Sequence, residues 1–541
     1  MPYRLSTQFR TDAHGKPLTD SAQPSIEEAG RHYAARNYAE AERICLAIVA
    51  RQPRHFDALH LLGVLCLEHR RLADAIGYLR QAERERPDEP QLHYHIGNAL
   101  LALAMFDEAE TEFRRSLTRR PTHFDSLNNL GNTLAGAGRH EEAIECYRQA
   151  LSVRPDAAEA LYNVGRSLFA LERLEEATET FRGILARHQD VESRRLVDVY
   201  SVLCPVLVEQ NRYDEALEVF RTVPADVADN PTIEWNESLT RLIVGDFADG
   251  WRKYESRFLV PAHDPPRPNA ALLDLNDISG KRVLLFHEQG RGDMIQMARY
   301  APLLAQRGAH VSIETYDDLT VLFSQLDAVE HVVGPLEDSP EHDLLTPLLS
   351  LPLVFHSELA TIPGDVPYLR APADRRAIWR KRLGETSTPR VGLMWRGAQH
   401  IPKRSVPIAA LEPVLRQGGC EFHALQNDMP TADRDWLAEN RAVRCHAAEL
   451  ADFADTAALI ECMDLIISID TSVAHLAGAL GVPVWIMLPF SPDWRWLRER
   501  EDSPWYPTAR LFRQTRRGDW EDVIQRVAAD LSLRFPHQPG G

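Results

Sequence analysis

A 34-residue period in the first third of this 541-residue chain limits its possible folds more than any other feature. An alanine returns at each period, a glycine lies twelve residues before most of these alanines, and a bulky side chain lies four residues after each. A proline closes most units. The positions are Ala41, Ala75, Ala109, Ala143 and Ala177; Gly63, Gly97, Gly131 and Gly165; Cys45, Leu79, Phe113, Tyr147 and Phe181; and Pro53, Pro87, Pro121 and Pro155. Small residues let two helices touch, the bulky residue fills the gap one turn on, and proline ends the second helix because it has no backbone N–H. The pattern therefore predicts stacked helix pairs.

This period and these residue types resemble the tetratricopeptide repeat (TPR), a helix–turn–helix unit of 34 residues. The resemblance implies an α-solenoid, a TPR superhelix. Two degenerate units follow the five regular ones, around Cys204 and Ala216 and around Ser238 and Gly250. We therefore expect about seven units over residues 25–258, preceded by a disordered tail over residues 1–24.

A concave groove is the binding surface that such a solenoid exposes. The first helices of successive units would place polar side chains along it, namely His95, Asn129 and Asn163, with Asn98 and Asn132 nearby. Asparagine both donates and accepts hydrogen bonds, so it can hold an extended peptide backbone without reading its sequence. The arrangement resembles the asparagine ladder of protein O-GlcNAc transferases. The alternative is that these asparagines only solvate a helix face.

Charge and composition narrow the partners and the compartment. The formal net charge of -18 disfavours nucleic acid and anionic membrane surfaces as main partners. The seven cysteines are scattered and form no CxxC pair, which favours buried free thiols over a zinc site or a disulfide framework. The N-terminus has no apolar signal segment, and no apolar run is long enough for a membrane span. We expect a cytoplasmic protein.

After residue 258 the helical period stops. A proline-rich stretch lies within a predicted linker over residues 259–280, and short β-branched runs then alternate with helical stretches. This pattern predicts an α/β region with parallel strands. A break near residues 372–389 divides it into two halves, over residues 281–375 and over residues 376–541 with a terminal helix. The expected strands are Arg282–His287, His310–Glu314, Arg390–Trp395, Glu421–Leu425, Leu465–Ile469 and Pro483–Leu488.

In each half, the loop that follows the first strand carries candidate site residues. Ligands of open α/β sheets bind at the carboxyl ends of strands. In the first loop, Gly290 and Gly292 would let backbone amides approach a ligand, and Asp293 opens the next helix. The alternative for Asp293 is a simple helix cap. The second loop gathers three cations, Arg396, Lys403 and Arg404, for which phosphate oxygens are the natural partner. A solvated basic loop is the alternative.

A third loop joins a strand to a helix of small residues and is the most informative. Asp470 precedes Thr471 and Ser472 at the predicted helix N-terminus, where free amides and the helix dipole favour an anion. His475 lies one turn in, on the face of Thr471. Gly478 allows either close packing or close ligand approach. Helix capping would explain Asp470 and Ser472, but it would not explain a histidine between small residues.

The run Asp470-Thr-Ser-x-x-His475-Leu-Ala-x-Ala-Leu-Gly-x-Pro483 resembles the nucleotide-sugar motif of ADP-heptose:lipopolysaccharide heptosyltransferases. The Gly292-Asp293 pair resembles the N-terminal loop of the same family. The whole chain resembles bacterial TPR proteins that carry a glycosyltransferase-like C-terminal domain. These resemblances imply a GT-B arrangement, a double Rossmann-like α/β domain, after the solenoid.

The resemblance also implies roles for the residues. Asp293 would be the general base, and Asp470, Thr471, Ser472 and His475 would hold a nucleotide diphosphate with help from Lys403 or Arg404. One base near the acceptor and N–H or positive density on the leaving diphosphate suit an inverting transfer. No Asp-x-Asp in a metal-binding context is evident in the sequence, so no catalytic metal and no cofactor beyond the nucleotide-sugar substrate is expected.

Three functions remain open at this point. In the first, the TPR groove recruits a protein or glycan acceptor and the C-terminal domain glycosylates it. In the second, the chain is a protein-interaction scaffold whose glycosyltransferase domain is degenerate. The third is a heptosyltransferase of cell-envelope assembly, which would prefer an ADP-sugar.

Overall fold

The computed structural model describes residues 25–187, 192–260, 267, 270–335, 339–397, 402–417, 419–440 and 442–536. The predicted tail over residues 1–24 and part of the predicted linker lie outside this part of the chain. The contacts divide the protein into two compact units, Met1–Val199 and Tyr200–Gly541. We call these the repeat unit and the α/β unit and describe each by itself.

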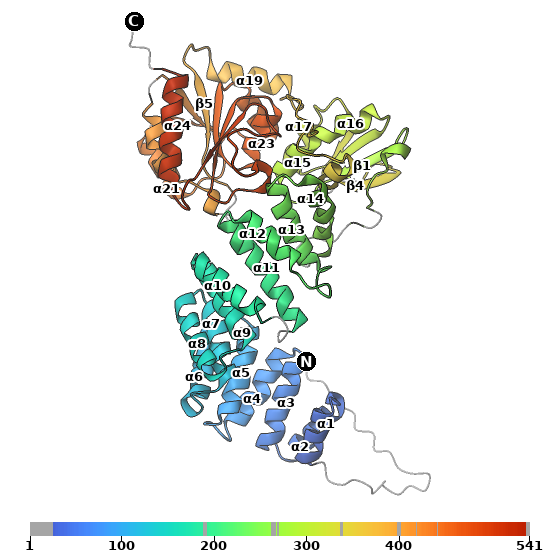
Figure 1. Cartoon of the computed structure of the whole chain (residues 1–541), viewed down its shortest axis with the longest axis vertical. Coiled ribbons are helices and arrows are strands. Elements are labelled where there is room, and N and C mark those ends of the chain that lie inside the picture. Colours follow the sequence, from blue (N-terminus) through green and yellow to red (C-terminus); the bar gives the residue numbers. More distant parts are fainter. Residues whose placement is uncertain are drawn as a thin grey trace. The chain divides into compact units, whose positions relative to one another are not determined.

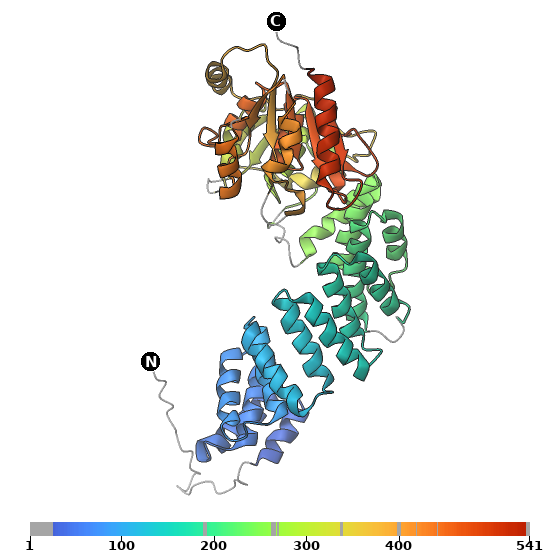
Figure 2. The ribbon, with the colours of Figure 1, turned by 90° about the vertical axis from the view of Figure 1, so that its left-hand side faces the viewer.

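The repeat unit is built from antiparallel helix pairs (Figures 1 and 2). Its complete helices are α1 (Ile26–Ala34), α2 (Tyr38–Arg51), α3 (Phe56–Glu68), α4 (Leu72–Glu83), α5 (Pro90–Ala102), α6 (Phe106–Arg119), α7 (Phe124–Gly136), α8 (His140–Val153), α9 (Ala158–Ala170) and α10 (Leu174–Leu185). Helix α11 (Ser193–Glu209) begins in this unit and continues into the next. The five regular units of the sequence period thus correspond to the five pairs from α1 to α10.

The periodic residues form the contacts inside each pair. All five periodic alanines are fully buried. Each periodic glycine faces the bulky residue sixteen positions later, so a Cβ atom on Gly97 would lie 2.8 Å from the Phe113 ring. This distance is shorter than any side chain tolerates, and it explains why glycine and a large residue recur together. The structure confirms the prediction that the small residues lie where the two helices of a pair touch and that the bulky residues fill the space beside them.

The α/β unit begins with three more helices, α12 (Tyr213–Arg221), α13 (Pro231–Ile243) and α14 (Phe247–Tyr254). These helices belong to the sixth and seventh predicted repeats, but their buried side chains share one hydrophobic core with the α/β region. Tyr213, Phe247 and Trp251 are examples, each at most 4% exposed. The predicted domain limits at residues 258 and 375 stay predictions.

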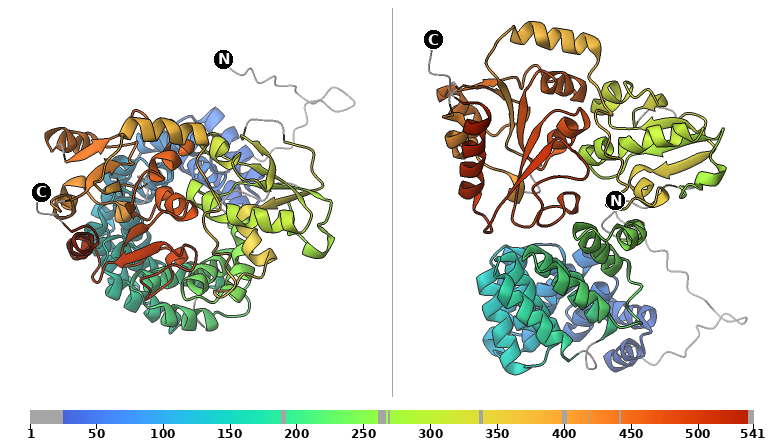
Figure 3. Two further views of the ribbon diagram at one scale, coloured as in Figure 1. Left: turned by 90° about the horizontal axis from the view of Figure 1, so that it is seen from above. Right: turned by 45° about the horizontal axis from the view of Figure 1, so that its top comes forward.

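Two separate parallel sheets follow, the first green-yellow and the second orange to red in Figure 3. The four-stranded sheet has the order β3-β2-β1-β4 and the six-stranded sheet the order β10-β9-β8-β5-β6-β7. Their strands are β1 (Arg282–Phe286), β2 (His310–Glu314), β3 (Val329–Val333), β4 (Leu344–Pro347), β5 (Arg390–Met394), β6 (Glu421–Ala424), β7 (Val443–Cys445), β8 (Leu465–Ile469), β9 (Val484–Leu488) and β10 (Ala509–Arg513). The predicted α/β region with parallel strands is confirmed, and the GT-B arrangement stays a prediction.

The central strands β8 and β9 of the six-stranded sheet are buried along their whole length, which is why they form apolar runs in the sequence. The helices between the strands are α15 (Arg291–Met297), α16 (Ala301–Gln306), α17 (Thr320–Phe323), α18 (Leu351–Val354), α19 (Ala373–Leu383), α20 (Glu412–Leu415), α21 (Thr431–Glu439), α22 (Phe453–Ile460) and α23 (Ser472–Ala479), and α24 (Trp520–Arg534) follows the last strand. Two of them, α15 after β1 and α23 after β8, carry the predicted site residues.

Candidate functional site

Helices α15 and α23 pack against each other at their N-terminal ends (Figure 1). A Cβ atom on Gly292 would lie 2.9 Å from His475 Cδ2 and 3.5 Å from Ser472 Cα. The lack of a side chain at Gly292 therefore allows this close approach. The structure brings together the first and third predicted loops, one from each sheet.

Asp293 is held at both of its carboxylate oxygens. Oδ2 accepts a hydrogen bond from the Gly290 backbone N–H at 2.7 Å, which caps the first turn of α15. Oδ1 pairs with the Arg495 guanidinium. The alternative left open by the sequence is that Asp293 is itself the N-cap. In the structure Gly290 is the N-cap and Asp293 is the third residue of α15, and its ion pair with Arg495 comes in addition to the bond to Gly290.

A buried ion cluster extends from this pair across the carboxyl ends of β1, β5, β8 and β9. Arg495 also binds Asp493 at 2.7 Å. Arg404 lies 2.8 Å from Asp470 and 3.3 Å from Asp493. The chain of contacts therefore runs from Asp293 through Arg495, Asp493 and Arg404 to Asp470.

The burial of this cluster shifts its acid–base equilibria. Asp470 has a side chain only 3% exposed, and loss of solvent raises its pKa although Arg404 opposes the shift. Burial acts in the same direction on Asp493, but Arg495 and Arg404 outweigh it and lower the Asp493 pKa. Asp493 is thus the carboxylate whose charged form both guanidiniums stabilise, and Asp470 holds a proton more readily than Asp493 does.

His475 is buried beneath aromatic side chains. Its ring stacks on Trp496 at 5.2 Å between centroids, and Nδ1 shares a hydrogen bond of 2.9 Å with the Tyr506 hydroxyl. Burial lowers the His475 pKa to about 3, so the imidazole is neutral at physiological pH. The Tyr506 ring also covers Gly478, where a Cβ atom would lie 2.4 Å from it. Of the two roles predicted for Gly478, the close packing is the one seen here.

Thr471 is the N-cap residue of α23, and Ser472 is the first residue of the helix. The Thr471 side chain makes no capping bond to the helix amides and instead lies 3.3 Å from the Ser468 hydroxyl. The first N–H groups of a helix have no partner within it. This end of α23 therefore keeps the N–H groups that the sequence analysis assigned to an anion.

The three cations after β5 do not gather on one ligand position. Arg396 binds Asp433 at 2.9 Å, and Lys403 lies 3.2 Å from Glu209. Only Arg404 reaches the cluster around Asp470. Residues 398–401 of the same predicted loop lie outside the described residues.

Asp493, Arg495 and Tyr506 are not among the predicted site residues. Trp496 is one of several tryptophans that could stack on a sugar or base or pack in the core, and it is fully buried. Asp493 and Arg495 flank a tryptophan in the run Asp493-Trp-Arg-Trp496, which includes a short 3-10 helix, Trp494–Trp496. Asp293, the partner of Arg495, is 202 residues away along the chain, and no local pattern reveals such a contact.

In the repeat unit, polar side chains of successive pairs form a ladder. Asn129 Nδ2 donates to Asn98 Oδ1 at 2.8 Å, and Asn163 Nδ2 donates to Asn128 Oδ1 at 3.1 Å. At the next step toward the N-terminus, His95 shares a 2.8 Å hydrogen bond with His60. These residues are half-buried or buried and bridge neighbouring repeats. The ladder fixes the positions of these side chains, and Asn128 Nδ2 also donates to Glu159 Oε1 at 3.1 Å.

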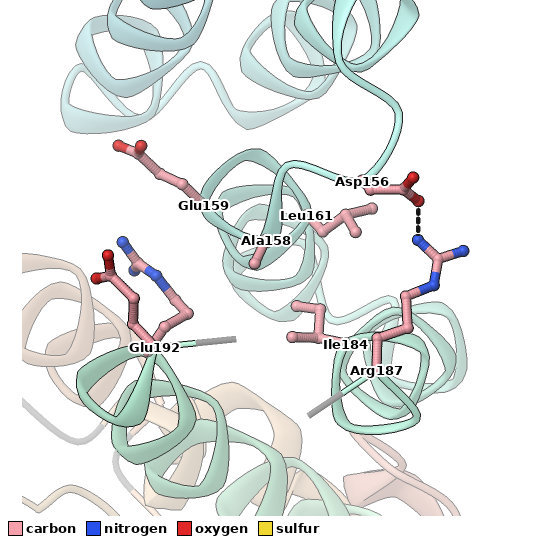
Figure 4. A pocket seen from close by; sticks show the side chains of 8 residues that line it. Asp156, Ala158, Glu159, Leu161, Ile184, Arg187 and Glu192 are labelled. Atoms are coloured by element: carbon pink, nitrogen blue, oxygen red, sulfur yellow. Dashed lines mark hydrogen bonds and ion pairs between the residues drawn. The ribbon is translucent and has the colours of Figure 1, made fainter. Parts of the chain in front are cut away.

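A cavity of about 840 Å³ lies at the C-terminal end of the repeat unit (Figure 4). Leu161 and Ile184 line it, together with an ion pair of Arg187 and Asp156 and with Glu192. Residues 188–191, which join two of these lining residues, lie outside the described part of the chain. We assign no ligand to this cavity.

A second cluster in the repeat unit has the residue types of a metal site. Ligand atoms of Glu83, His93 and Glu112 lie within 4.8 Å of one another. However, Arg80 binds both glutamates at 2.8 Å, and both ring nitrogens of His93 are hydrogen bonded. A positive guanidinium already occupies the position between the carboxylates, so we interpret the cluster as an ion network between repeats.

Comparisons with known proteins concern mainly the repeats. Two family models, both described as tetratricopeptide repeat, match the chain. The first matches residues 26–90 and 128–191, and the second matches residues 88–156. Protein FlbA of Caulobacter vibrioides is 27% identical over 336 residues, which cover 57% of this chain. The chain spans little more than half of that relative, 56% of its length.

Solved structures with similar folds include MamA from Desulfovibrio magneticus, with 17% identity and a TM-score of 0.30 over 32% of this chain and 99% of that one. PilW, described as a type IV pilus biogenesis factor, has 17% identity and a TM-score of 0.35 over 39% of this chain and 94% of its own. Among the described helices, none combines the length and apolar character that crossing a membrane requires. Residues 26–191 are tetratricopeptide repeats, as their period predicts.

Proposed function

We propose that this protein is a glycosyltransferase that uses a nucleotide-sugar and acts on a protein or glycan acceptor recruited by the TPR repeats. The transfer is inverting and needs no metal ion. The observation that supports it most directly is the contact between α15 and α23. This contact brings Asp293, a candidate base, next to a helix N-terminus suited to a diphosphate.

Each group has a defined task in this proposal. The N–H groups at Thr471 and Ser472 bind the diphosphate, and Arg404 contributes positive charge. His475 is neutral and buried, so it orients α23 against α15. Arg495 covers Asp293 in this structure. A leaving diphosphate would attract Arg495, and Asp293 would then be free to take the proton of the acceptor hydroxyl.

A second function, a scaffold without catalysis, also has a specific observation in its favour. Each cation predicted to bind phosphate is already paired with a carboxylate: Arg396 with Asp433, Lys403 with Glu209, and Arg404 with Asp470. A domain that had lost its donor could retain such pairs for stability alone. The TPR groove would then carry the whole function.

Calorimetric titration with UDP-, GDP- and ADP-sugars separates the two functions. The glycosyltransferase proposal expects one of them to bind the native chain and to bind a His475→Ala variant more weakly. If no donor binds, the scaffold is the better description. A preference for an ADP-sugar would favour a heptosyltransferase-like activity.

Asp293→Asn tests the catalytic role. The substitution keeps the size of the side chain but removes its basicity, so we expect transfer to be lost while donor binding remains nearly intact. Turnover is measured with the donor identified by calorimetry, and donor affinity with the same titration. A variant with full transfer activity would exclude Asp293 as the base.

A further inference from the structure

The ion cluster of the α/β unit has one carboxylate more than its guanidiniums can neutralise. Among the described residues, the ion-pair partners of Asp293, Asp470 and Asp493 are Arg404 and Arg495. All are largely buried, and the most exposed side chain is that of Arg404, at 25%. An unbalanced charge in such surroundings is costly, so the cluster is neutral only when one carboxyl carries a proton.

The surroundings of Asp470 identify it as the carboxyl that takes this proton. The groups facing it are Arg404 and Arg495, which favour its charged form, Asp493, which opposes it, and the Trp496 side chain. Asp493 and Asp293 each contact Arg495 directly, whereas Asp470 contacts only Arg404, which it shares with Asp493. His475 is neutral and Lys403 is paired with Glu209, so neither balances the charge.

A diphosphate that binds at the N-terminus of α23 would bring further negative charge to this cluster. The charge can be balanced by a proton on the cluster or by a divalent cation. Within the described residues, the group of carboxylates and histidines that converges tightly enough for a cation is Glu83, His93 and Glu112 in the repeat unit. Each carboxylate of the cluster instead has a guanidinium at one of its oxygens, which favours the proton.

We propose that the cluster takes up one proton, on Asp470, when it binds the diphosphate group of a nucleotide-sugar. Protonation releases Arg404 from Asp470, and the freed guanidinium turns to a phosphate oxygen. The inference rests on the proposed function, because it assigns proton-linked binding to the same donor site. By linkage, the affinity for the diphosphate then falls as the pH rises.

The test is a calorimetric titration of the full chain with UDP-, GDP- and ADP-glucose. These diphosphate diesters carry no phosphate group that titrates near neutral pH, so any proton uptake belongs to the protein. The titration is repeated in buffers of different ionisation enthalpy, with EDTA present, across roughly pH 5 to 8. Above the pKa of Asp470 in the unliganded protein, we expect the dissociation constant to rise about tenfold per pH unit. The dependence of the binding heat on the buffer should then correspond to one proton taken up per ligand bound.

Asp470→Asn mimics the protonated carboxyl. This variant should bind the same donor more tightly than the native chain at the upper end of the pH range, with an affinity independent of pH and no buffer-dependent heat. Asp455→Asn is the matched control, because Asp455 is also buried and pairs with an arginine, Arg375 at 3.1 Å, but lies outside the cluster. It should keep the proton uptake of the native chain, and thermal unfolding of both variants verifies that they fold.

The outcomes separate the two proposals. Binding with a flat pH profile, or binding that requires added Mg²⁺, would overturn the proton-linked inference and leave the glycosyltransferase proposal standing. Loss of proton uptake in Asp455→Asn as well would also overturn the assignment to Asp470. If neither the native chain nor Asp470→Asn binds any of the three donors, the proposed function itself fails.

Discussion

A single glycine decides how closely each helix pair of the repeats can pack. A Cβ atom on Gly131 would lie 2.4 Å from the ring of Tyr147, which is 2% exposed and whose hydroxyl donates to Asn132 Oδ1 at 2.9 Å. We expect Gly131→Ala to destabilise the repeat unit by about 1–3 kcal/mol through overpacking. Chemical denaturation of the native chain and the variant measures the difference.

The control is Gly77→Ala, since Gly77 is an exposed residue within α4 and has no atom near the position of an added Cβ. That substitution should stabilise the helix by about 0.5–1 kcal/mol, because alanine loses less backbone freedom on folding. Equal effects of the two substitutions would show that helix propensity, and not the contact with Tyr147, determines the result at Gly131.

His93 gives the repeat unit a pH dependence of its own. Its Nδ1 faces a Glu112 oxygen at 2.6 Å and its Nε2 faces the Pro87 carbonyl at 2.7 Å, so both nitrogens donate only when the ring is charged. The hydrogen bond to Glu112 raises the His93 pKa although burial opposes the shift. A raised pKa in the folded state adds stability that is full below the unfolded value of about 6.5 and is lost as the pH rises through the folded value.

We therefore expect the free energy of unfolding of the repeat unit to fall as the pH increases above about 6.5, and His93→Gln to remove this part of the slope. Denaturant titrations at a series of pH values measure both. Burial alone would raise the Glu112 pKa, but hydrogen bonds from His93 and Arg80 lower it. The contribution of Glu112 is therefore lost only in acid, and a slope unchanged in His93→Gln would argue against the charged pair.

At the scale of elements, the sequence predicts what periodicity or apolar runs encode. The strands β1, β2, β5, β6, β8 and β9 were all expected within a residue of their observed ends, because most of their buried positions hold apolar residues. The strands β3, β4, β7 and β10 were not predicted. β3 is partly exposed and mixes charge with valine, and β7 has only three residues. Neither leaves an apolar run, and the pairing that defines them is not local.

Some features of the candidate site could likewise be predicted from the sequence, and others could not. Its loops could be found from glycines, a helix N-terminus and an isolated histidine, which are local signals. The pairing of Asp293 with Arg495 and of Arg404 with Asp470 depends on how the sheets bring distant loops together. The number of charges in the cluster, and hence its need for a proton, is therefore a property of the fold.

The docking of α15 on α23 depends on one missing side chain. A Cβ atom on Gly292 would meet the His475 ring at 2.9 Å, and Tyr506 and Trp496 hold this ring in place. We expect Gly292→Ala to destabilise the α/β unit by about 1–3 kcal/mol and to weaken any donor binding. Gly397→Ala is the control, because its Cβ would lie 3.6 Å from Thr471, an ordinary contact. A Gly292→Ala protein as stable as the control would mean that the helices are not tightly docked.

At the scale of the whole molecule, the compact unit that contains the two sheets also contains the last helices before them. Helices α12 to α14 are continuous with the repeats in sequence but pack into the α/β unit. Asn211 donates a 2.8 Å hydrogen bond to the Phe490 carbonyl, and Trp251 packs edge-on to Trp494 at 5.1 Å. These contacts hold the segment that carries Asp493 and Arg495. The helices before the α/β sheets therefore support the candidate site.

Two truncations test this division. A chain that starts at Ser193 keeps α11 to α14, and we expect it to fold cooperatively and to bind a donor as the full chain does. A chain that starts at Ala225 loses α11 and α12, including Asn211 and the buried Tyr213, so the hydrophobic core of the α/β unit is opened to solvent. We expect it to unfold at a lower temperature and to lose donor binding, because the segment with Arg495 is no longer held.

Calorimetry and thermal unfolding of the two chains measure both effects. Equal stability of the two would place α11 and α12 outside the α/β unit and would return the sixth repeat to the solenoid.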